Sequence, residues 1–397
     1  MVSFLTILTI PKGGGMMYLD HNSTTKIDKR VLSRMMPYFR ENFTNPSSIY
    51  RIAQEAREVL EDARETVANC LKCGPKEIYF TSGGTESNNL AIKGTAWRRR
   101  REGNHIITSR IEHHAVLNPC RWLEGMGFRV SYIPVDSTGI VHVDALRKAI
   151  TPQTILISIM WVNNEIGTIQ PIKEIAEIAR EKGIYFHTDA VQAIGKIPVN
   201  LKEIRVDMLS LSGHKIYGPK GIGVLFVREG THIESLIHGG SHEMSLRAGT
   251  ENVPEIIGLS EAVKIATTEL GEENRRLSIL RDKLETGLQE RIPDIIINGH
   301  REKRVSNTLS LCIRYVEGES VLLHLDLNEI CASSGSACTS GSTKPSHVLL
   351  AMGIEPEIAY GSLRFSLGRK NTEEDIDKVL DILPRIVEKL RSMSPYK

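Results

Sequence analysis

Short apolar segments that alternate with helical patterns constrain the fold of this chain more than any other feature of its sequence. Near-continuous apolar strands are typical of a parallel sheet whose two faces are both covered by helices. The strands expected from this pattern are 77–82, 105–110, 154–162, 184–187, 208–212 and 223–227, and helical patterns between them include 85–101, 114–125 and 172–182. The chain is therefore predicted to be an α/β protein with a mostly parallel sheet.

The pattern changes in the last third of the chain. A long helical pattern runs from Gly258 to about Arg291, and it is followed by apolar segments at 306–314 and 363–367 and a final helix from Thr372. This succession predicts a smaller α+β domain. A chain of 397 residues with 41% hydrophobic content can bury two cores, which agrees with two domains.

The composition of the chain limits which partners it is expected to bind and where in the cell it is expected to lie. A net charge of +2 favours neither a nucleic acid nor a membrane surface as partner, and no apolar run approaches the ~20 residues that span a bilayer. Six cysteines in so long a chain are not a disulfide framework, so the protein is expected to be cytoplasmic. The apolar stretch 2–10 has no charged region before it, and 1–16 is interpreted as a disordered extension and not as a signal peptide.

The segment 207–223 places reactive side chains at the end of a predicted buried strand. Its apolar run ends at Ser212, and Gly213, His214 and Lys215 follow directly, before a glycine-rich turn. An amine there can form a Schiff base with pyridoxal phosphate, while hydroxyl and imidazole groups hold the phosphate. A surface turn with a solvated lysine is the alternative, and two further segments favour the cofactor.

The first of these segments carries an acidic residue. Asp189 lies just past the predicted strand 184–187, and ligands of open α/β sheets collect at the carboxyl ends of strands. A carboxylate there can keep the pyridine nitrogen of pyridoxal phosphate protonated, so that the ring withdraws electrons. Gln192 follows one turn later and could donate to the phenolate oxygen of the ring. The alternative is that Asp189 only caps a helix that starts near Ala190.

The second segment is a glycine pair between a strand and a helix. The strand 77–82 runs into Gly83 and Gly84, and a helix begins around Thr85. The first N–H groups of a helix lack intrahelical partners and carry the positive end of its dipole, which suits a phosphate. Neither glycine-rich fingerprint of the common nucleotide-binding folds occurs in this segment. Together with the lysine segment, the junction predicts the phosphate end of one site, and the alternative is that the glycines serve only the turn.

Cys338 lies in a segment, 331–345, that is rich in Ser, Gly, Ala and Thr. Such a composition cannot form a core, and an accessible thiol is a reactive one. Cys331 follows Ile330 in an apolar strand and is instead predicted to be a small core residue. Cys70 and Cys73 form a single C-x-x-C pair, and we interpret them as structural residues near a helix end and not as metal ligands.

Together these segments resemble the class V aminotransferase-like enzymes of pyridoxal phosphate, and the Cys338 segment is similar to the catalytic loop of cysteine desulfurases of the NifS/IscS type. The resemblance extends from 18–25 to 363–369, with the motifs in the family's order. It implies fold type I: a large cofactor-binding domain, 26–258, with a seven-stranded sheet, and a small domain formed by 17–25 and 259–397. It also implies a homodimer that converts L-cysteine to L-alanine and leaves a persulfide on Cys338.

The same resemblance implies roles for residues at matching motif positions. His113 stacks on the cofactor ring and moves protons, with His114 as the fallback if the register differs by one. Arg364 grips the substrate carboxylate, a task that suits a planar guanidinium. Thr250 reaches the phosphate across the dimer interface. The other implied contacts are Asn22 and Asn164 with the substrate, and Gly84, Thr85, Asn164, Asp189, Gln192, Ser212, His214 and Lys215 with the cofactor.

The implied mechanism separates proton transfer from sulfur transfer. Lys215 moves the α-proton of the substrate, the Cys338 thiolate attacks its sulfur, and the loop carries sulfur to an acceptor, such as an iron–sulfur scaffold protein. Selenocysteine lyase on the same scaffold is an alternative. An aminotransferase is less favoured, because transamination needs no thiol. A binding protein with a decayed active site is also less favoured, because the reactive residues are all present. The acceptor, and transient ligation of an iron–sulfur cluster by Cys338, are left open.

Overall fold

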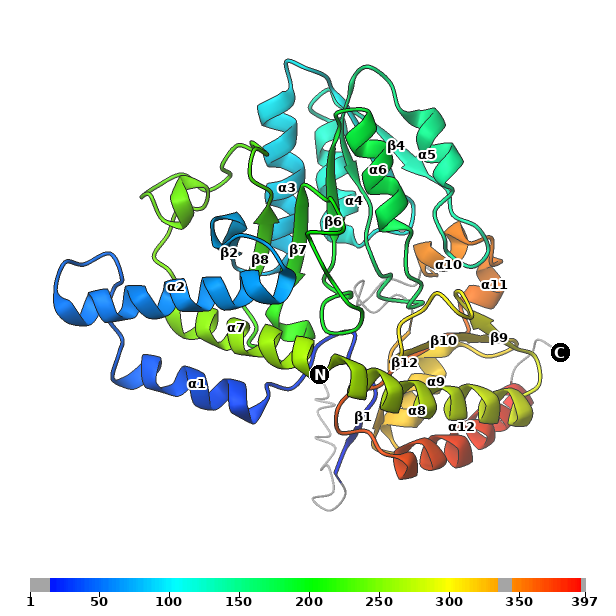
Figure 1. The fold of residues 1–397 in the computed structure, drawn as a ribbon. Coiled ribbons are helices and arrows are strands. Elements are labelled where there is room, and N and C mark those ends of the chain that lie inside the picture. Colours follow the sequence, from blue (N-terminus) through cyan, green and yellow to red (C-terminus); the bar gives the residue numbers. More distant parts are fainter. Residues whose placement is uncertain (1–14, 335–344, 394–397) are drawn as a thin grey trace, which may run out of the picture.

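A seven-stranded sheet forms the centre of the protein (Figure 1). The computed structural model describes residues 15–334 and 345–393. The strand order is β2-β8-β7-β6-β5-β3-β4, and β8 runs antiparallel to both of its neighbours while the other pairs are parallel. The predicted mostly parallel sheet is thus confirmed. Its strands are β2 (Ile78–Thr81), β3 (His105–Ser109), β4 (Arg129–Ile133), β5 (Thr154–Ser158), β6 (Tyr185–Asp189), β7 (Met208–Ser212) and β8 (Gly223–Val227).

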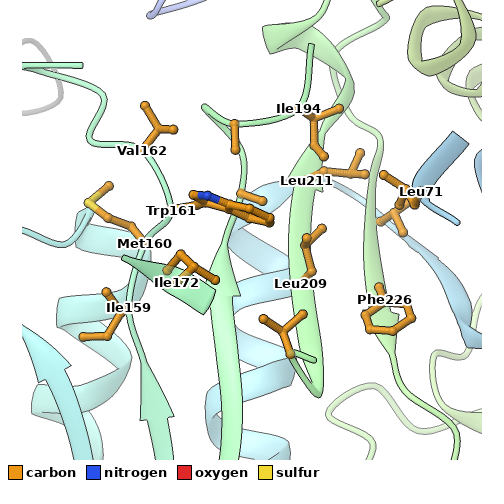
Figure 2. Packing of buried hydrophobic residues seen from close by; sticks show 14 of the residues in the cluster. Leu71, Ile159, Met160, Trp161, Val162, Ile172, Ile194, Leu209, Leu211 and Phe226 are labelled. Atoms are coloured by element: carbon orange, nitrogen blue, oxygen red, sulfur yellow. The ribbon is translucent and has the colours of Figure 1, made fainter. Parts of the chain in front are cut away.

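Helices cover both faces of this sheet, as near-continuous apolar strands require. Successive strand residues point to opposite faces, so Ile106 packs in one core with α3 and α4, while Ile107 packs in another with α2, α6 and α7. Figure 2 shows part of the second core, where Trp161 lies among Leu209, Ile172 and Ile194. The helices of this part are α1 (Lys29–Arg40), α2 (Arg51–Leu71), α3 (Gly84–Arg99), α4 (His114–Glu124), α5 (Val143–Ala149), α6 (Ile172–Glu181) and α7 (Val253–Thr268).

A separate hydrophobic core lies beside the large sheet, around a three-stranded antiparallel sheet (Figure 1). It gathers Leu19 near the start of the chain with residues from 277 to 387. The elements of this part are α8 (Leu270–Arg291), β9 (Ile295–Asn298), β10 (Thr308–Ile313), α9 (Gly318–Asp326), β12 (Ser362–Ser366) and α12 (Glu373–Met393), and β1 (Met17–Tyr18) pairs with β11 (Ile330–Cys331) in parallel. The short helices α10 (His347–Ala351) and α11 (Pro356–Ala359) pack against the core of the large sheet instead. Within the described ranges, no helix is long and apolar enough to cross a membrane.

Three expected elements differ from the structure. The single helix expected from Gly258 to Arg291 is two helices, which meet at Glu269. Thr267 and Thr268 precede the break, and both hydroxyls bond back to carbonyls four residues earlier, which bends helices. The strand expected at 154–162 ends at Ser158, and residues 191–196 form turns and not a helix.

A buried ion pair fixes a strained loop against β2. Arg64 and Glu243 have side chains only 6% and 3% exposed, and two hydrogen bonds of 2.8 and 3.0 Å join them. Glu243 also accepts from the backbone N–H of Phe80. Glu243, Met244 and Ser245 all have positive φ, which is costly for residues other than glycine. The ion pair therefore offsets local backbone strain.

Removing one partner of this pair is expected to destabilise the protein strongly. Glu243→Ala leaves the Arg64 guanidinium buried without its counter-ion, so we expect the free energy of unfolding to fall by about 3–5 kcal/mol. Glu55→Ala is the matched control, because the Arg51–Glu55 pair is exposed and such pairs contribute at most about 1 kcal/mol. Urea denaturation of both variants measures the difference, and equal small losses would contradict the prediction.

Candidate active site

The predicted site residues converge on one cavity of about 380 Å³. It lies where β6 and β7 end and α3 begins, at the carboxyl ends of parallel strands, as expected for an open α/β sheet. Its size is within the range of small-molecule sites. Eleven of the residues that the sequence singled out line it: Asn22, Gly84, Thr85, His113, Asn164, Asp189, Gln192, Ser212, His214, Lys215 and Arg364.

Lys215 enters the cavity from a short 3-10 turn that follows β7 directly. Its Nζ donates hydrogen bonds to the backbone carbonyls of Asn22 and Ser23, both at 2.7 Å. Asn22 and Ser23 belong to the chain segment that runs from the smaller core back to the large sheet. The amine is therefore held at the meeting point of the two parts of the molecule.

Asp189 is the last residue of β6, not the residue after it. Its Oδ2 accepts from Asn88 Nδ2 at 2.6 Å, and its Oδ1 accepts from the backbone N–H of Val191 at 3.0 Å. Asp189 thus caps a turn, and it also faces the cavity. Asn88 was not singled out from the sequence, although it follows Thr85 by three residues and so lies one helical turn along the same face of α3.

The start of α3 forms a cradle that is suited to a phosphate. Gly83 has φ of +147°, which residues with a side chain rarely adopt, and a Cβ on Gly84 would lie 2.7 Å from Val191 Cγ2, so both positions favour glycine where the helix begins. Thr85, Ser212 and His214 place two hydroxyls and an imidazole around the same part of the cavity. Burial lowers the pKa of His214 to about 4, and the charges of Lys215 and Lys220 act in the same direction. The imidazole is therefore neutral near pH 7.

His113 lines the cavity, whereas the fallback residue His114 does not. His113 is the N-cap of α4, and its Nδ1 accepts from the backbone N–H of Ala115 at 3.0 Å. Because this contact occupies Nδ1 as an acceptor, Nε2 carries the proton of the neutral ring. Burial lowers the pKa of His113, and Lys215 adds to this effect while Asp189 opposes it.

Arg364 reaches the cavity from β12 and is already held by several groups. Its Nη2 donates to Asp20 Oδ1 at 2.7 Å and to Ser23 Oγ at 2.9 Å, and its Nη1 donates to the Asn164 carbonyl at 3.1 Å. Its Nε is buried without a partner among the described residues. The guanidinium is thus firmly oriented, but part of its donor fork is occupied by Asp20, a residue that the sequence argument did not include.

Thr250 and Cys338 are the two predicted site residues that remain. Thr250 is exposed and does not line the cavity of its own chain. Cys338 and the segment 335–344 lie outside the described residues, as do 1–14 of the expected extension. The prediction that Cys331 belongs to the core is wrong: Cys331 is half-buried, because β11 has only two residues and pairs with β1 alone.

The chain on either side of the Cys338 segment is fixed beside the cavity. Ser333 exchanges two backbone hydrogen bonds with Arg364, at 3.1 and 2.6 Å. On the other side, Ser346 Oγ donates to buried Glu165 at 2.5 Å, and His347 Nε2 donates to the Glu112 carbonyl at 3.0 Å. Cys338 follows Ser333 by five residues. At ~3.6 Å per residue, five residues of any chain span at most about 18 Å.

Comparison with known proteins agrees with this geometry. Residues 17–379 match the family model described as Aminotransferase class-V. The chain is 57% identical over 378 residues to "Cysteine desulfurase IscS" of Methanosarcina thermophila, which covers 95% of this chain and 93% of that protein. It is 54% identical over 380 residues to "Cysteine desulfurase IscS" of Dictyoglomus turgidum, covering 96% of each.

Solved structures give the same result. A structure titled "NIFS-LIKE PROTEIN" superimposes with a TM-score of 0.89 at 41% identity, covering 94% of this chain and all of the other. A second, titled "SspA in complex with cysteine", gives a TM-score of 0.79 at 39% identity, covering 88% of this chain and 98% of the other. The chain therefore belongs to the class-V aminotransferase family. Within that family it belongs with the cysteine desulfurases of the NifS/IscS type, which depend on pyridoxal phosphate.

Proposed function

We propose that this protein is a cysteine desulfurase that takes sulfur from L-cysteine, releases L-alanine and holds the sulfur as a persulfide on Cys338. The observation that carries the proposal is the cavity, which brings an amine, a carboxylate, a neutral imidazole and a phosphate cradle together between chain anchors that flank Cys338. The strong similarity to proteins named cysteine desulfurase supports it. We also propose a cytoplasmic homodimer whose acceptor is an iron–sulfur scaffold protein or another sulfur-accepting protein.

The residues of the cavity fit pyridoxal phosphate. The backbone N–H groups at the start of α3, with Thr85, Ser212 and His214, would hold the phosphate, and Lys215 would attach the cofactor. Asp189 would hold a proton on the ring nitrogen, because Asn88 and Val191 orient its carboxylate at the end of β6. When bound, the cofactor supplies an electron-withdrawing ring that stabilises negative charge next to the substrate's α-carbon.

The protein's own groups divide the remaining work. Lys215 Nζ takes the proton from the substrate α-carbon and returns protons later, a role for an amine held between two carbonyls at the cavity wall. Arg364 binds the substrate carboxylate through a guanidinium that Asp20 and Ser23 have already oriented.

Sulfur transfer falls to Cys338. Its thiolate attacks the substrate sulfur, so that a sulfur–sulfur bond forms as the bond between that sulfur and the substrate β-carbon breaks. The β-carbon gains a proton and leaves as part of alanine, and Cys338 retains the persulfide. The contacts of Ser333 and Ser346, on either side of the segment that carries Cys338, support this assignment.

The direct test is turnover of L-cysteine by the purified protein with pyridoxal phosphate. Equal amounts of alanine and sulfide are expected in the presence of a thiol reductant, and one added sulfur per subunit without it. Release of pyruvate, or transfer of the amino group to a keto acid with no sulfide, would contradict the proposal. Comparing turnover with L-selenocysteine distinguishes a desulfurase from a selenocysteine lyase.

The proposed dimer predicts a specific rescue. Thr250 is exposed in its own subunit, which agrees with a contact to the phosphate of the partner's site. Lys215→Ala and Thr250→Ala proteins are each expected to be impaired, but their mixture should regain activity after subunit exchange. Each heterodimer then has one site with both defects and one with neither. If mass spectrometry shows exchange and activity does not return, Thr250 does not act across the interface.

A further inference from the structure

A second amine lies near Lys215, on the far side of Asn22. Lys196 follows Gln192 by four residues in the turns after β6, and its Nζ donates to Asn22 Oδ1 at 2.9 Å and to Gln192 Oε1. Across 15–334 and 345–393, no carboxylate lies at ion-pairing distance from this amine, and the positive Lys215 and Arg364 are nearby. Burial, reinforced by those two charges, lowers the pKa of Lys196 well below its ordinary value.

Lys196 as a whole is only half-buried, but a charged amine with little access to water is costly to keep where no counter-ion offsets the lost hydration. Lys196 does not line the cavity that holds the other site residues. It therefore has no evident contact with substrate or cofactor. Its effect must pass through the two amide side chains that it contacts.

The contact with Gln192 determines which way that amide faces. Lys196 Nζ donates to Oε1 of Gln192, so the carbonyl oxygen and not the NH₂ group lies on that side. The NH₂ group then points away from Lys196, and one of its N–H groups donates to the Asn22 carbonyl at 2.9 Å. The reversed amide would lose the hydrogen bond that Lys196 donates and would set its own oxygen against the Asn22 carbonyl, which is also an acceptor. Only one orientation satisfies both neighbours.

The second N–H of Gln192 has no partner among the described residues, and Gln192 lines the cavity. This N–H is thus available to an acceptor atom of a bound molecule. Asn22 is held in the same manner: its Oδ1 accepts from Lys196 and from Asn307, while its Nδ2 donates to the Asn164 carbonyl and to Thr308. Lys196 fixes the orientation of both amides at this wall.

We propose that Lys196 is a positioning residue, which orients the Gln192 amide so that an N–H donor faces the cavity. This inference rests on the proposed function, in which that donor serves an oxygen of pyridoxal phosphate. Lys196 acts through Gln192 and not through the fold as a whole.

A double-mutant cycle tests this coupling through the dissociation constant of pyridoxal phosphate, measured by absorbance titration of the apoprotein. Lys196→Met and Gln192→Leu are each expected to weaken binding about 3- to 10-fold, the effect of one hydrogen bond. The double variant is expected to bind no more weakly than Gln192→Leu alone. Lys196→Gln, whose amide can still donate, should stay within about twofold of the wild type. Lys202→Met, at an exposed lysine, is the control for loss of a positive charge.

The inference would be overturned if the dissociation constant of the double variant rose by the product of the two single-variant increases, because Lys196 would then act independently of Gln192. So would equal losses in Lys196→Gln and Lys196→Met. A wild-type apoprotein that binds no pyridoxal phosphate would instead overturn the proposed function, and the inference with it. Thermal melting of each apoprotein checks folding; Lys196→Met is expected to fold, since apolar replacement of a buried uncompensated amine is often neutral. Lys196→Leu takes its place if it does not.

Discussion

Cys338→Ser is expected to lower sulfide and alanine production from L-cysteine by at least about 10²-fold, while the yellow colour of the bound cofactor remains. The reason is chemical, because a serine hydroxyl is not ionised near pH 7 and cannot replace a thiolate as the sulfur nucleophile. The proton-moving groups of the cavity are unchanged in this variant. The absorbance of the cofactor should therefore still respond to added L-cysteine.

Cys331→Ser is the matched control in the same region. Because Cys331 is half-buried in a two-residue strand, the added hydroxyl can reach water, and both turnover and stability should change little. Mass spectrometry of protein treated with L-cysteine should place the extra sulfur on Cys338 and not on Cys331. Near-normal alanine production by Cys338→Ser would contradict both the mechanism and the proposed activity.

Lys215→Ala is expected to abolish covalent attachment of pyridoxal phosphate and to reduce turnover by about 10²–10⁴-fold or more. Lys215 is the amine that the structure places inside the cavity, with two carbonyls fixing its Nζ. Borohydride reduction of the wild-type protein, followed by peptide mapping, should find the pyridoxyl group on Lys215. Methylamine should restore part of the activity of the variant if the missing group is the amine itself.

Lys220→Ala is the control for this prediction. Lys220 lies in the same glycine-rich turn but is exposed, so its removal should leave cofactor attachment and turnover near those of the wild type. A pyridoxyl label on Lys220, or full activity in Lys215→Ala, would show that the cofactor lysine is wrongly assigned.

Local sequence was sufficient to predict the site residues that lie at the end of a strand. Lys215 and Asp189 follow or end buried strands, and strand ends of one parallel sheet share an edge. Gly84 and Thr85 could be predicted for a similar reason. A strand followed by glycines and the start of a helix can be recognised from about ten consecutive residues. Near-continuous apolar segments that alternate with helical patterns likewise predicted the sheet and its covering helices.

The sequence by itself therefore determined the fold class, the cavity's edge and the types of reactive group, since each depends on periodicity or chemistry within a few residues. Only the tertiary structure decided which distant groups meet. Asn88 orients Asp189, Asp20 occupies part of Arg364, and Lys196 orients two amides, because chain segments that are far apart in sequence pack together. The tertiary structure also decided that Thr250 faces outward and that Cys331 is not in the core. Burial depends on the neighbours that packing supplies, and local residue patterns do not specify those neighbours.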